Sequence, residues 1–540
     1  MDSINVTDIW RDYQRGRDYL NSINLFDKVE TCFNMVNGDQ WKGLKYGKDR
    51  PPQLNILLPI MKSSTALVGQ NVMNIEFTSM NYGEGRQHLL EVTEMLNSHA
   101  KKTWERLKMD KLNWEILQDA YISGNSAYWF YDDASVAEGK IMVETLDTTN
   151  IMLGDEQQPD IQKQPYILVV QRKHIEDVKK LAESFGIDEH DINSIIADSD
   201  TELQINGENE VRGSQKVTVI AKLWKKDGIV HIMRATKTVV IQPETAVDGI
   251  KRYPIAMYTW KPRKGLARGD GDVWDKIPNQ ISINKSLFRM EQAVKNSAYP
   301  IKAYNRDLID NNQVAKLNQP GAAVEVKGNA GTIANAIGYL QPANISPYAK
   351  TYWQDLIQLT RDLSGAGDNL ENVNPEQASG ASIQAALDAK LLNVNMQVAA
   401  YRQFVEDIAW IWYEMFAAYN PNGLDVVIET EQGDVVQKIP QVDLLALKVD
   451  IKVDALPSTA THSAIKDAQL RSLLENNIIT FEEYVSALAD DSTMPVEAFR
   501  KIVEGRRKMQ QIQQLVESQQ AQIAQYQQLL GGMTNEMQTV

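Results

Sequence analysis

The chain has 540 residues, of which 43% are hydrophobic, and a formal net charge of -15 at pH 7. This length and apolar content support one large core or two to three smaller ones, which excludes a disordered chain. The acidic balance argues against a protein whose main task is to grip nucleic acid through a basic surface, so we expect any DNA contact to be local or loose. The single cysteine, Cys32, excludes an internal disulfide framework and a multi-cysteine metal site, and fits folding in a reducing cytoplasm.

No stretch of the sequence approaches the roughly 18 to 20 consecutive apolar residues of a membrane span. The N-terminal segment also lacks an apolar signal core. We therefore expect a soluble protein that is not exported by that route.

The first 130 residues show helical periodicity in three stretches, 19–35, 54–71 and 86–122. Small residues and then aromatics follow at 123–133, which indicates a turn into a strand. Strand patterns dominate residues 140–260, where two apolar runs flank the hairpin turn Asp227-Gly228. This half of the chain is predicted to be α+β.

A helix is predicted over 272–298, interrupted early by Pro278. At about 100° per residue its apolar side chains form two stripes roughly 150° apart, whereas an ordinary surface helix has one. Either identical helices stand side by side in a ring and touch both stripes, or the helix is buried within one domain. The first stripe holds Trp274, Ile277, Ile281 and Phe288, the second holds Ile283, Leu287, Met290 and Val294, and a polar stripe between them holds Lys285, Arg289, Gln292 and Asn296.

Short strands and turns are predicted for 299–345 and a helix for 347–363. The polar segment 364–380 has no apolar periodicity and is predicted to be a loop. A long helix follows over 381–419. A loop of about 15 residues between two strong helices is uncommon and usually functional. The continuous apolar face of the long helix holds Ile383, Leu387, Leu391, Val394, Val398, Tyr401, Val405, Ile408 and Trp412.

A second β region is predicted for 423–455, and helices for 463–474, 480–488 and from 495 onward. The Gln-rich end carries an imperfect heptad stripe of about four repeats, interrupted by Gly505 and Gln519. This stripe indicates either an intersubunit bundle or a solvated terminal helix. Its apolar members are Met509, Ile512, Val516, Ile523, Tyr526 and Leu530.

Motifs that carry chemistry are missing from the sequence. There is no G-x-x-x-x-G-K-[ST], no H-E-x-x-H and no G-x-S-x-G. The acidic patch GDGD at 269–272 lacks the later ligands of an EF-hand loop, so we interpret it as a turn that leads into a helix. We expect no catalytic residue, no metal site, no cofactor and no enzymatic activity.

Four segments, taken in order, resemble the portal proteins of tailed bacteriophages, the head-to-tail connectors, and in particular their podovirus-type branch. Residues 37–77 are similar to the family's N-terminal segment with its Gly-x-Gln-Trp turn, and 122–133 to a helix-to-strand passage. Residues 269–292 carry an Asp-rich turn followed by Pro-x-Gln and Ile-Asn-Lys, as at the start of the family's stem. Residues 364–390 resemble the tunnel loop and the Ser-Gly-x-x-Ile opening of the helix after it.

The resemblance implies an α+β portal fold with long helices and mixed sheets, assembled as a ring, usually a dodecamer, around a DNA channel. It divides the chain into wing (1–268), first stem helix (269–298), clip (299–345), second stem helix (346–364), tunnel loop (365–378), long helix with a β return to the wing (379–460), crown (461–500) and C-terminal helix, a possible short barrel (501–540).

The resemblance also implies where DNA passes. Lys285 and Arg289 form a limited guiding ring if their stripe faces the channel, or else pair with acidic groups of a neighbouring subunit. Acidic loop residues repel phosphates, so DNA slides, whereas a strongly basic channel would hold it. The expected channel residues of the loop are Asp368, Asn369, Glu371, Asn372, Asn374 and Glu376.

The partners implied are the major capsid protein, the terminase ATPase that docks at the clip, head-tail adaptors or tail proteins, and double-stranded DNA during packaging and ejection. The implied location is the portal vertex of the virion, after assembly in the host cytoplasm. Two alternatives remain: a ring translocase that hydrolyses nucleotide itself, which the missing P-loop disfavours, and a head-tail adaptor or other structural virion protein.

Overall fold

The computed structural model describes residues 5–43, 45, 51–81, 86–132, 141–198, 215–246, 249–298, 301–319, 321–340, 346, 348–364, 380–430, 433–457 and, further on, 467, 470–476, 478–488, 492, 494–496, 498–499, 501–503, 505–506 and 509. The chain forms two compact units. The first contains residues 1–69 and 73–454, and the second contains 70–72 and 455–540. Helices and several small sheets alternate along the chain, which confirms the predicted α+β class. Among the described helices none is long and apolar enough to cross a membrane.

Five helices make up most of the N-terminal part, where three helical stretches were predicted. They are α1 (Val6–Ser22), α2 (Leu25–Asn37), α3 (Leu57–Gly69), α4 (Arg86–Leu107) and α5 (Met109–Ser123). The stretch predicted as one helix over 86–122 is two, because Lys108 adopts the left-handed conformation with φ of 54° and ends the first. Asn24, also at φ 54°, separates α1 from α2 in the same way.

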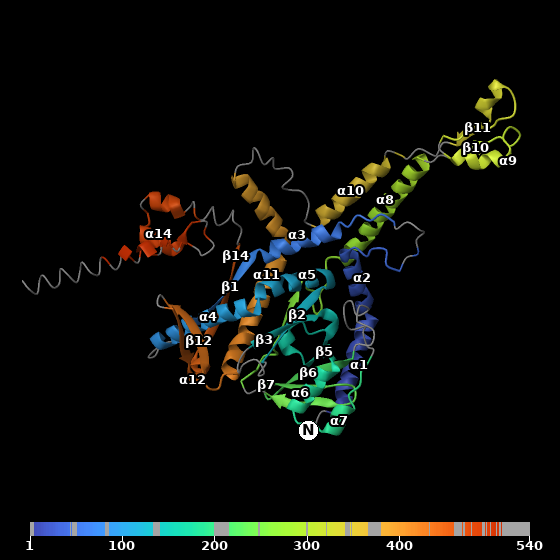
Figure 1. Ribbon diagram of the computed structural model, residues 1–540. Helices are drawn as coiled ribbons and strands as arrows, with labels where there is room; N and C mark the ends of the chain where they lie inside the picture. Colours follow the sequence, from blue (N-terminus) through green and yellow to red (C-terminus); the bar gives the residue numbers. More distant parts are fainter. Residues whose placement is uncertain are drawn as a thin grey trace, which may run out of the picture. The chain divides into compact units, whose positions relative to one another are not determined.

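Two antiparallel sheets follow (Figure 1). The three-stranded sheet has the order β3-β2-β9 and is built from β2 (Asn125–Asp132), β3 (Ile141–Asp147) and β9 (Ile255–Thr259). The five-stranded sheet has the order β4-β5-β6-β7-β8 and contains β4 (Ile151–Leu153), β5 (Tyr166–His174), β6 (Lys216–Lys226), β7 (Ile229–Ala235) and β8 (Val240–Ala246). The predicted turn Asp227-Gly228 joins β6 to β7, with φ of 52° and 80°, as a type I′ hairpin turn requires.

Short helices accompany the five-stranded sheet. Helix α6 (Ile175–Ser184) and helix α7 (Glu189–Asn193) follow β5 in the chain. Their apolar residues Ile175, Val178 and Ile192 pack with Val217 and Ile241 of the sheet in one cluster. This layer is remote in sequence from the residues of the candidate site.

The long helix α11 (Gly380–Ala418) forms the centre of the first unit's aromatic core. Trp412 is fully buried, and its ring centroid lies 6.0 Å from that of Phe130 and 6.1 Å from that of Trp104. Phe404 packs in the same way against Tyr128 and Tyr258. The predicted apolar face is therefore confirmed from Val394 to Trp412, and its first residues lie where side chains are not described.

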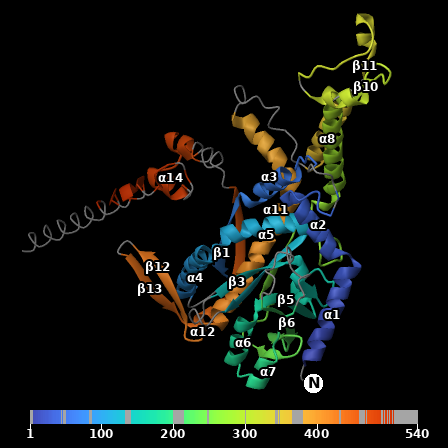
Figure 2. The same ribbon diagram turned by 45° about the vertical axis from the view of Figure 1, so that its right-hand side comes forward.

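Helices α8 (Ile277–Ala298) and α10 (Tyr348–Leu363) lie side by side (Figure 1). A short 3-10 turn, η4 (Trp274–Lys276), precedes α8. Between the two helices the chain forms β10 (Ile301–Tyr304), which pairs antiparallel with β11 (Ile337–Leu340), and the short helix α9 (Asn311–Val314). Both views place this pair of strands at the C-terminal end of α8 (Figures 1 and 2).

The remaining strands form two-stranded sheets. Strands β12 (Leu424–Thr430) and β13 (Gly433–Ile439) pair with each other, and α12 (Gln441–Ala446) follows. Strand β14 (Val449–Pro457) pairs with β1 (Asn71–Ser79). In the second unit, α14 (Phe481–Ala487) begins with a capping box between Thr480 and Glu483.

Replacing Trp412 by alanine should lower the free energy of unfolding by about 3–5 kcal/mol, because a fully buried indole leaves a large cavity. Trp114, which is 39% exposed, provides the matched control. Denaturant unfolding followed by circular dichroism would measure both, and an equal loss in the two variants would contradict the central role of Trp412.

Candidate functional site: the buried junction at the start of helix α8

Three of the segments that resemble portal sequences meet where α8 begins. Residues 38–41 after α2, 123–125 after α5, and 269–284 are distant in sequence, yet hydrogen bonds join them directly. The chain reaches this arrangement through close backbone packing, one ionic cluster and one network of buried amides.

The first feature is a contact between two glycine-containing turns. A Cβ on Gly269 would lie 2.4 Å from the carbonyl oxygen of Lys261, and one on Gly271 would lie 2.4 Å from that of Ile122. Gly124 has φ of 100° and would bring its Cβ within 2.5 Å of the Gly269 oxygen. Only glycine fits such close approaches. The acidic patch GDGD is thus a tightly packed turn that leads into η4 and α8, as the sequence indicated.

Asn125 fastens the same two turns through its side-chain amide. Its Oδ1 accepts a hydrogen bond of 2.8 Å from the Gly269 N–H, and its Nδ2 donates one of 2.7 Å to Thr259 Oγ1. Asn125 is buried, so both bonds are shielded from water. The entry to α8 is therefore fixed against the three-stranded sheet.

The second feature is the carboxylate of Asp272, which lies between two lysines. It pairs with Lys261, and Lys276 Nζ lies 2.6 Å from its Oδ2. Burial favours the neutral form of Asp272, but the two ammonium groups outweigh it and hold the pKa of the carboxyl below its usual value. Burial lowers the pKa of Lys276, an effect that Asp272 opposes. This cluster of one carboxylate and two ammonium groups stabilises the start of the helix as a salt bridge. It has too few carboxylates to bind a cation.

The third feature is a network of side-chain amides that sequence reasoning did not single out as functional. Gln280 and Asn284 of α8 are 0% and 2% exposed. Gln280 Oε1 accepts from the Ile56 N–H at 3.1 Å, and its Nε2 donates to the Leu54 oxygen at 2.7 Å. Asn284 Oδ1 accepts from the Leu54 N–H at 3.0 Å and from Gln280 Nε2 at 3.1 Å. The two amides thus satisfy three backbone groups of the segment that precedes α3.

The network continues into the turn after α2. Asn284 Nδ2 donates to Gln40 Oε1 at 2.6 Å, and Gln40 Nε2 donates to the Met35 oxygen at 2.8 Å. Gln40 belongs to the Gly-x-Gln-Trp turn, and Gln280 and Asn284 belong to Pro-x-Gln and Ile-Asn-Lys. The three motifs therefore contained the clamp residues, but the sequence did not reveal that these residues bind one another. We call Gln40, Gln280 and Asn284 the amide clamp.

The predicted interface residues of α8 divide by burial. Ile277 is 7% and Ile283 0% exposed, and Ile283 packs against Ile56 and Ile60 of its own chain. Both side chains are buried within their own chain, and the contact with a neighbouring subunit stays a prediction for them. Trp274 and Val294 are exposed, and the half-buried members are Ile281, Leu287, Phe288 and Met290.

The predicted channel residues on α8 are all exposed in the single chain. They are Lys285, Arg289, Gln292 and Asn296. Their stripe lies about 130° around the helix from the amide clamp, taking 100° per residue. The role of this stripe stays a prediction, as does that of the exposed and half-buried apolar residues.

Helix α10 carries an exposed apolar stripe that the sequence reasoning missed. Tyr348 and Leu363 are 81% exposed, Tyr352 58% and Leu359 57%. The side chains that pack towards Ile283 lie on a different face, about 100° around the helix, and include Trp353, Leu356 and Ile357. Spacings of four, seven and four residues between the exposed members could have revealed the stripe.

Two other groups of predicted residues lie outside the described part of the chain. The tunnel-loop residues 368–376 form one group. In the C-terminal stripe only Met509 is described, at 70% exposed, and 512–530 are not. The roles expected of these residues therefore stay predictions.

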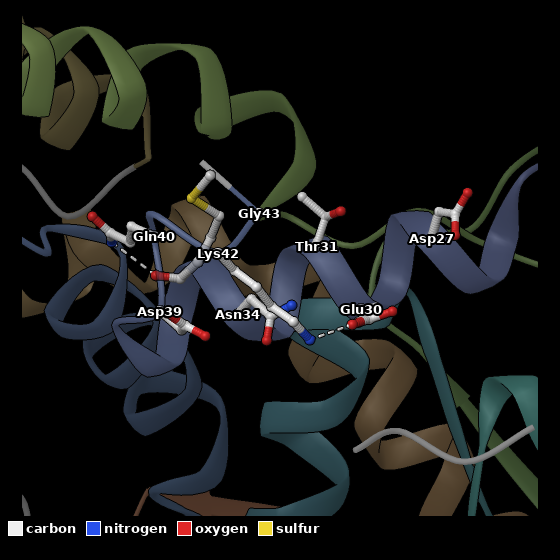
Figure 3. Close-up of a pocket in the computed structure, with 9 residues that line it drawn as sticks. Asp27, Glu30, Thr31, Asn34, Asp39, Gln40, Lys42 and Gly43 are labelled. Atoms are coloured by element: carbon white, nitrogen blue, oxygen red, sulfur yellow. Dashed lines mark hydrogen bonds and ion pairs between the residues drawn. The ribbon is translucent and has the colours of Figure 1, made fainter. Parts of the chain in front are cut away.

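An open pocket of about 260 Å³ lies beside the clamp, on α2 and the turn after it (Figure 3). Asp27, Glu30 and Asp39 make its lining acidic, and Lys42 Nζ lies 2.6 Å from Glu30 Oε1. Gln40 forms part of the wall. Within the described residues, no group of three or more His, Cys, Asp or Glu side chains is arranged to hold a metal ion. We assign no ligand to this pocket.

Replacing Asp272 by asparagine should cost about 3 kcal/mol of unfolding free energy at neutral pH, because it leaves two lysines without their buried partner. A carboxyl whose pKa is lowered by folding stabilises the protein above its unfolded pKa of about 4, and this contribution is lost as the pH falls through the folded pKa. The difference between wild type and variant should thus shrink in acid.

Unfolding curves at several pH values would measure this difference. Asp275→Asn, an exposed neighbour, serves as the control and should stay within about 0.5 kcal/mol of wild type. A difference that persists at low pH would show that Asp272 acts through packing and not through its charge.

The comparisons with known proteins point to one family. A family model described as phage P22-like portal protein matches residues 154–539, which include the GDGD turn, α8, α10 and α11. None of the curated proteins compared with the chain matches it. The matched region covers well over half of the sequence and contains two of the three clamp residues. The chain therefore belongs to the phage P22-like portal protein family.

Proposed function

We propose that the chain is the subunit of a ring that forms the entry and exit channel for double-stranded DNA at one capsid vertex. The observation that supports this most strongly is the pair α8 and α10, which leaves a polar stripe on one helix and an apolar stripe on the other uncovered. An apolar stripe of this size on a folded chain calls for a partner. A second copy of the same helix pair provides one, and a closed ring repeats the arrangement.

In this proposal the α10 stripe packs against the stem of the next subunit. The surface it meets there includes the uncovered apolar residues of α8, of which Val294 is the most exposed at 60%. On α11, Leu392 and Met396 are also more than 70% exposed and lie one helical turn apart. The C-terminal heptad stripe is proposed as a further contact between subunits.

The polar stripe then faces the channel. Lys285 and Arg289, repeated around a ring, form a belt of positive charge that guides DNA without holding it, because few phosphates are neutralised at one time. The acidic and Asn-rich tunnel loop at 365–378 is proposed as the constriction. The division into wing, stem, clip, tunnel loop and crown given above is part of the same proposal.

The chain is proposed to perform no catalysis. Energy for packaging comes from the terminase ATPase, which docks at the clip around β10 and β11, and adaptors or tail proteins take its place afterwards. The major capsid protein surrounds the ring at the vertex of the virion. Before assembly, the subunit is proposed to reside in the host cytoplasm.

Replacing Leu359 and Leu363 by glutamate should abolish ring formation, because charged groups would be buried at the subunit contact. Gln354→Glu with Gln358→Glu adds the same charge to exposed positions elsewhere on α10 and should leave rings intact. Electron microscopy and native mass measurement distinguish the two results. Rings in the leucine variant would disprove the assignment of the α10 stripe.

Deleting residues 369–376 should leave rings intact and impair DNA retention or packaging. Packaging assays with purified capsids would measure the loss. If rings fail to form, the segment has a structural role and the loop assignment is wrong. DNA-stimulated ATP hydrolysis by the purified chain alone would instead support the translocase alternative.

A further inference from the structure

Helix α8 has more apolar surface than a single packing face needs. Around the helix, the two apolar stripes and the residues between them span about 180°, at 100° per residue. Ile283 packs towards α10 and α3, and Trp274, at the other stripe, lies under the ammonium group of Lys28, which is 5.5 Å from its ring centroid. Hydrophobic contact alone is non-directional. It would therefore tolerate several rotations of α8 about its own axis.

The amide clamp, in contrast, does not tolerate rotation of α8 about its own axis. Gln280 and Asn284 lie at the centre of the broad inner face, fully buried, and each of their hydrogen bonds needs a particular direction. Rotation by one residue step would bury these polar groups without partners, which is strongly unfavourable. Buried asparagines specify register in coiled coils by the same physical means.

The hydrogen bonds also run in one chain of donors. Gln280 Nε2 donates to Asn284, Asn284 donates to Gln40, and Gln40 donates to a backbone oxygen at the end of α2. Such chains polarise one another and act as a unit. The position of the turn after α2 is thus linked to the rotation of α8.

We infer that Gln40, Gln280 and Asn284 are positioning residues that set the rotation of α8 and so decide which side chains its exposed face presents. The clamp lies about 130° around the helix from the stripe that begins at Lys285. Because both are on the same rigid helix, the clamp also sets the direction in which that stripe faces. The consequence for DNA rests on the proposed function. The positioning of α8 does not rest on the proposed function, and it can be measured without DNA.

Single cysteines at Arg289, which is exposed, and Met290, which is half-buried, report the rotation in the purified full chain. Cys32 is 1% exposed, and burial raises the pKa of its thiol to about 12, so it reacts little. The measured quantity is the ratio of the modification rates, Arg289→Cys over Met290→Cys. Gln280→Met or Asn284→Leu should lower this ratio by about tenfold, as expected from the loss of two to three buried hydrogen bonds.

Gln40→Met changes no residue of α8 and should lower the ratio in the same direction. It also provides the readout if the α8 variants do not fold. Gln280→Glu keeps the acceptor for the Ile56 N–H but loses the Nε2 donor to the Leu54 oxygen and to Asn284 Oδ1, so it should lower the ratio as Gln280→Met does.

Ile283→Ala is the matched control, because it removes an apolar contact at the same place and leaves the amides unchanged. It should lower the melting temperature without changing the ratio. An unchanged ratio in the Gln40, Gln280 and Asn284 variants, or an equal fall in Ile283→Ala, would overturn the inference and leave the amides a purely structural role.

Discussion

Two side-chain amides buried on one helix connect the parts of this molecule on which its proposed function depends. Gln280 and Asn284 give hydrogen bonds to a segment with no regular structure of its own, the residues before α3, and so allow that segment to be buried. Buried backbone groups need such partners. Because the partners lie on α8, the N-terminal part of the chain and the start of α8 become one structural unit.

The glycine turns and Asp272 make the same unit rigid from the other side. Gly269 and Gly271 bring backbones too close for any side chain, and Asn125 locks the contact. The negative charge of Asp272 offsets the repulsion between Lys261 and Lys276, which packing brings close together. The helix entry is thus held by sterics, by directional hydrogen bonds and by ion pairing, three forces that respond differently to temperature, salt and pH.

Local signals in the sequence predicted local structure well. The Asp227-Gly228 turn was predicted correctly because few residue pairs adopt positive φ at two successive positions, and Asp-Gly is one of them. The buried face of α11 was predicted correctly because its apolar pattern is long and regular. The break at Lys108 was missed because lysine is a good helix former and rarely adopts the left-handed conformation that separates the two helices. The clamp was missed because its bonds to the N-terminal segments link residues 224 to 244 positions apart, and no pattern within one segment reports such a pairing.

The polar stripe on α8 has a length that matters for motion. Lys285 and Asn296 are eleven residues apart, a rise of about 16 Å, or roughly half of a 34 Å turn of B-DNA. In the proposed ring, the stripe of each helix would run along about half a turn of the duplex, so phosphates and a groove would face it together as the duplex advances. The attraction summed over the ring would then vary little with each step, so the energy profile along the channel would be nearly flat and friction low.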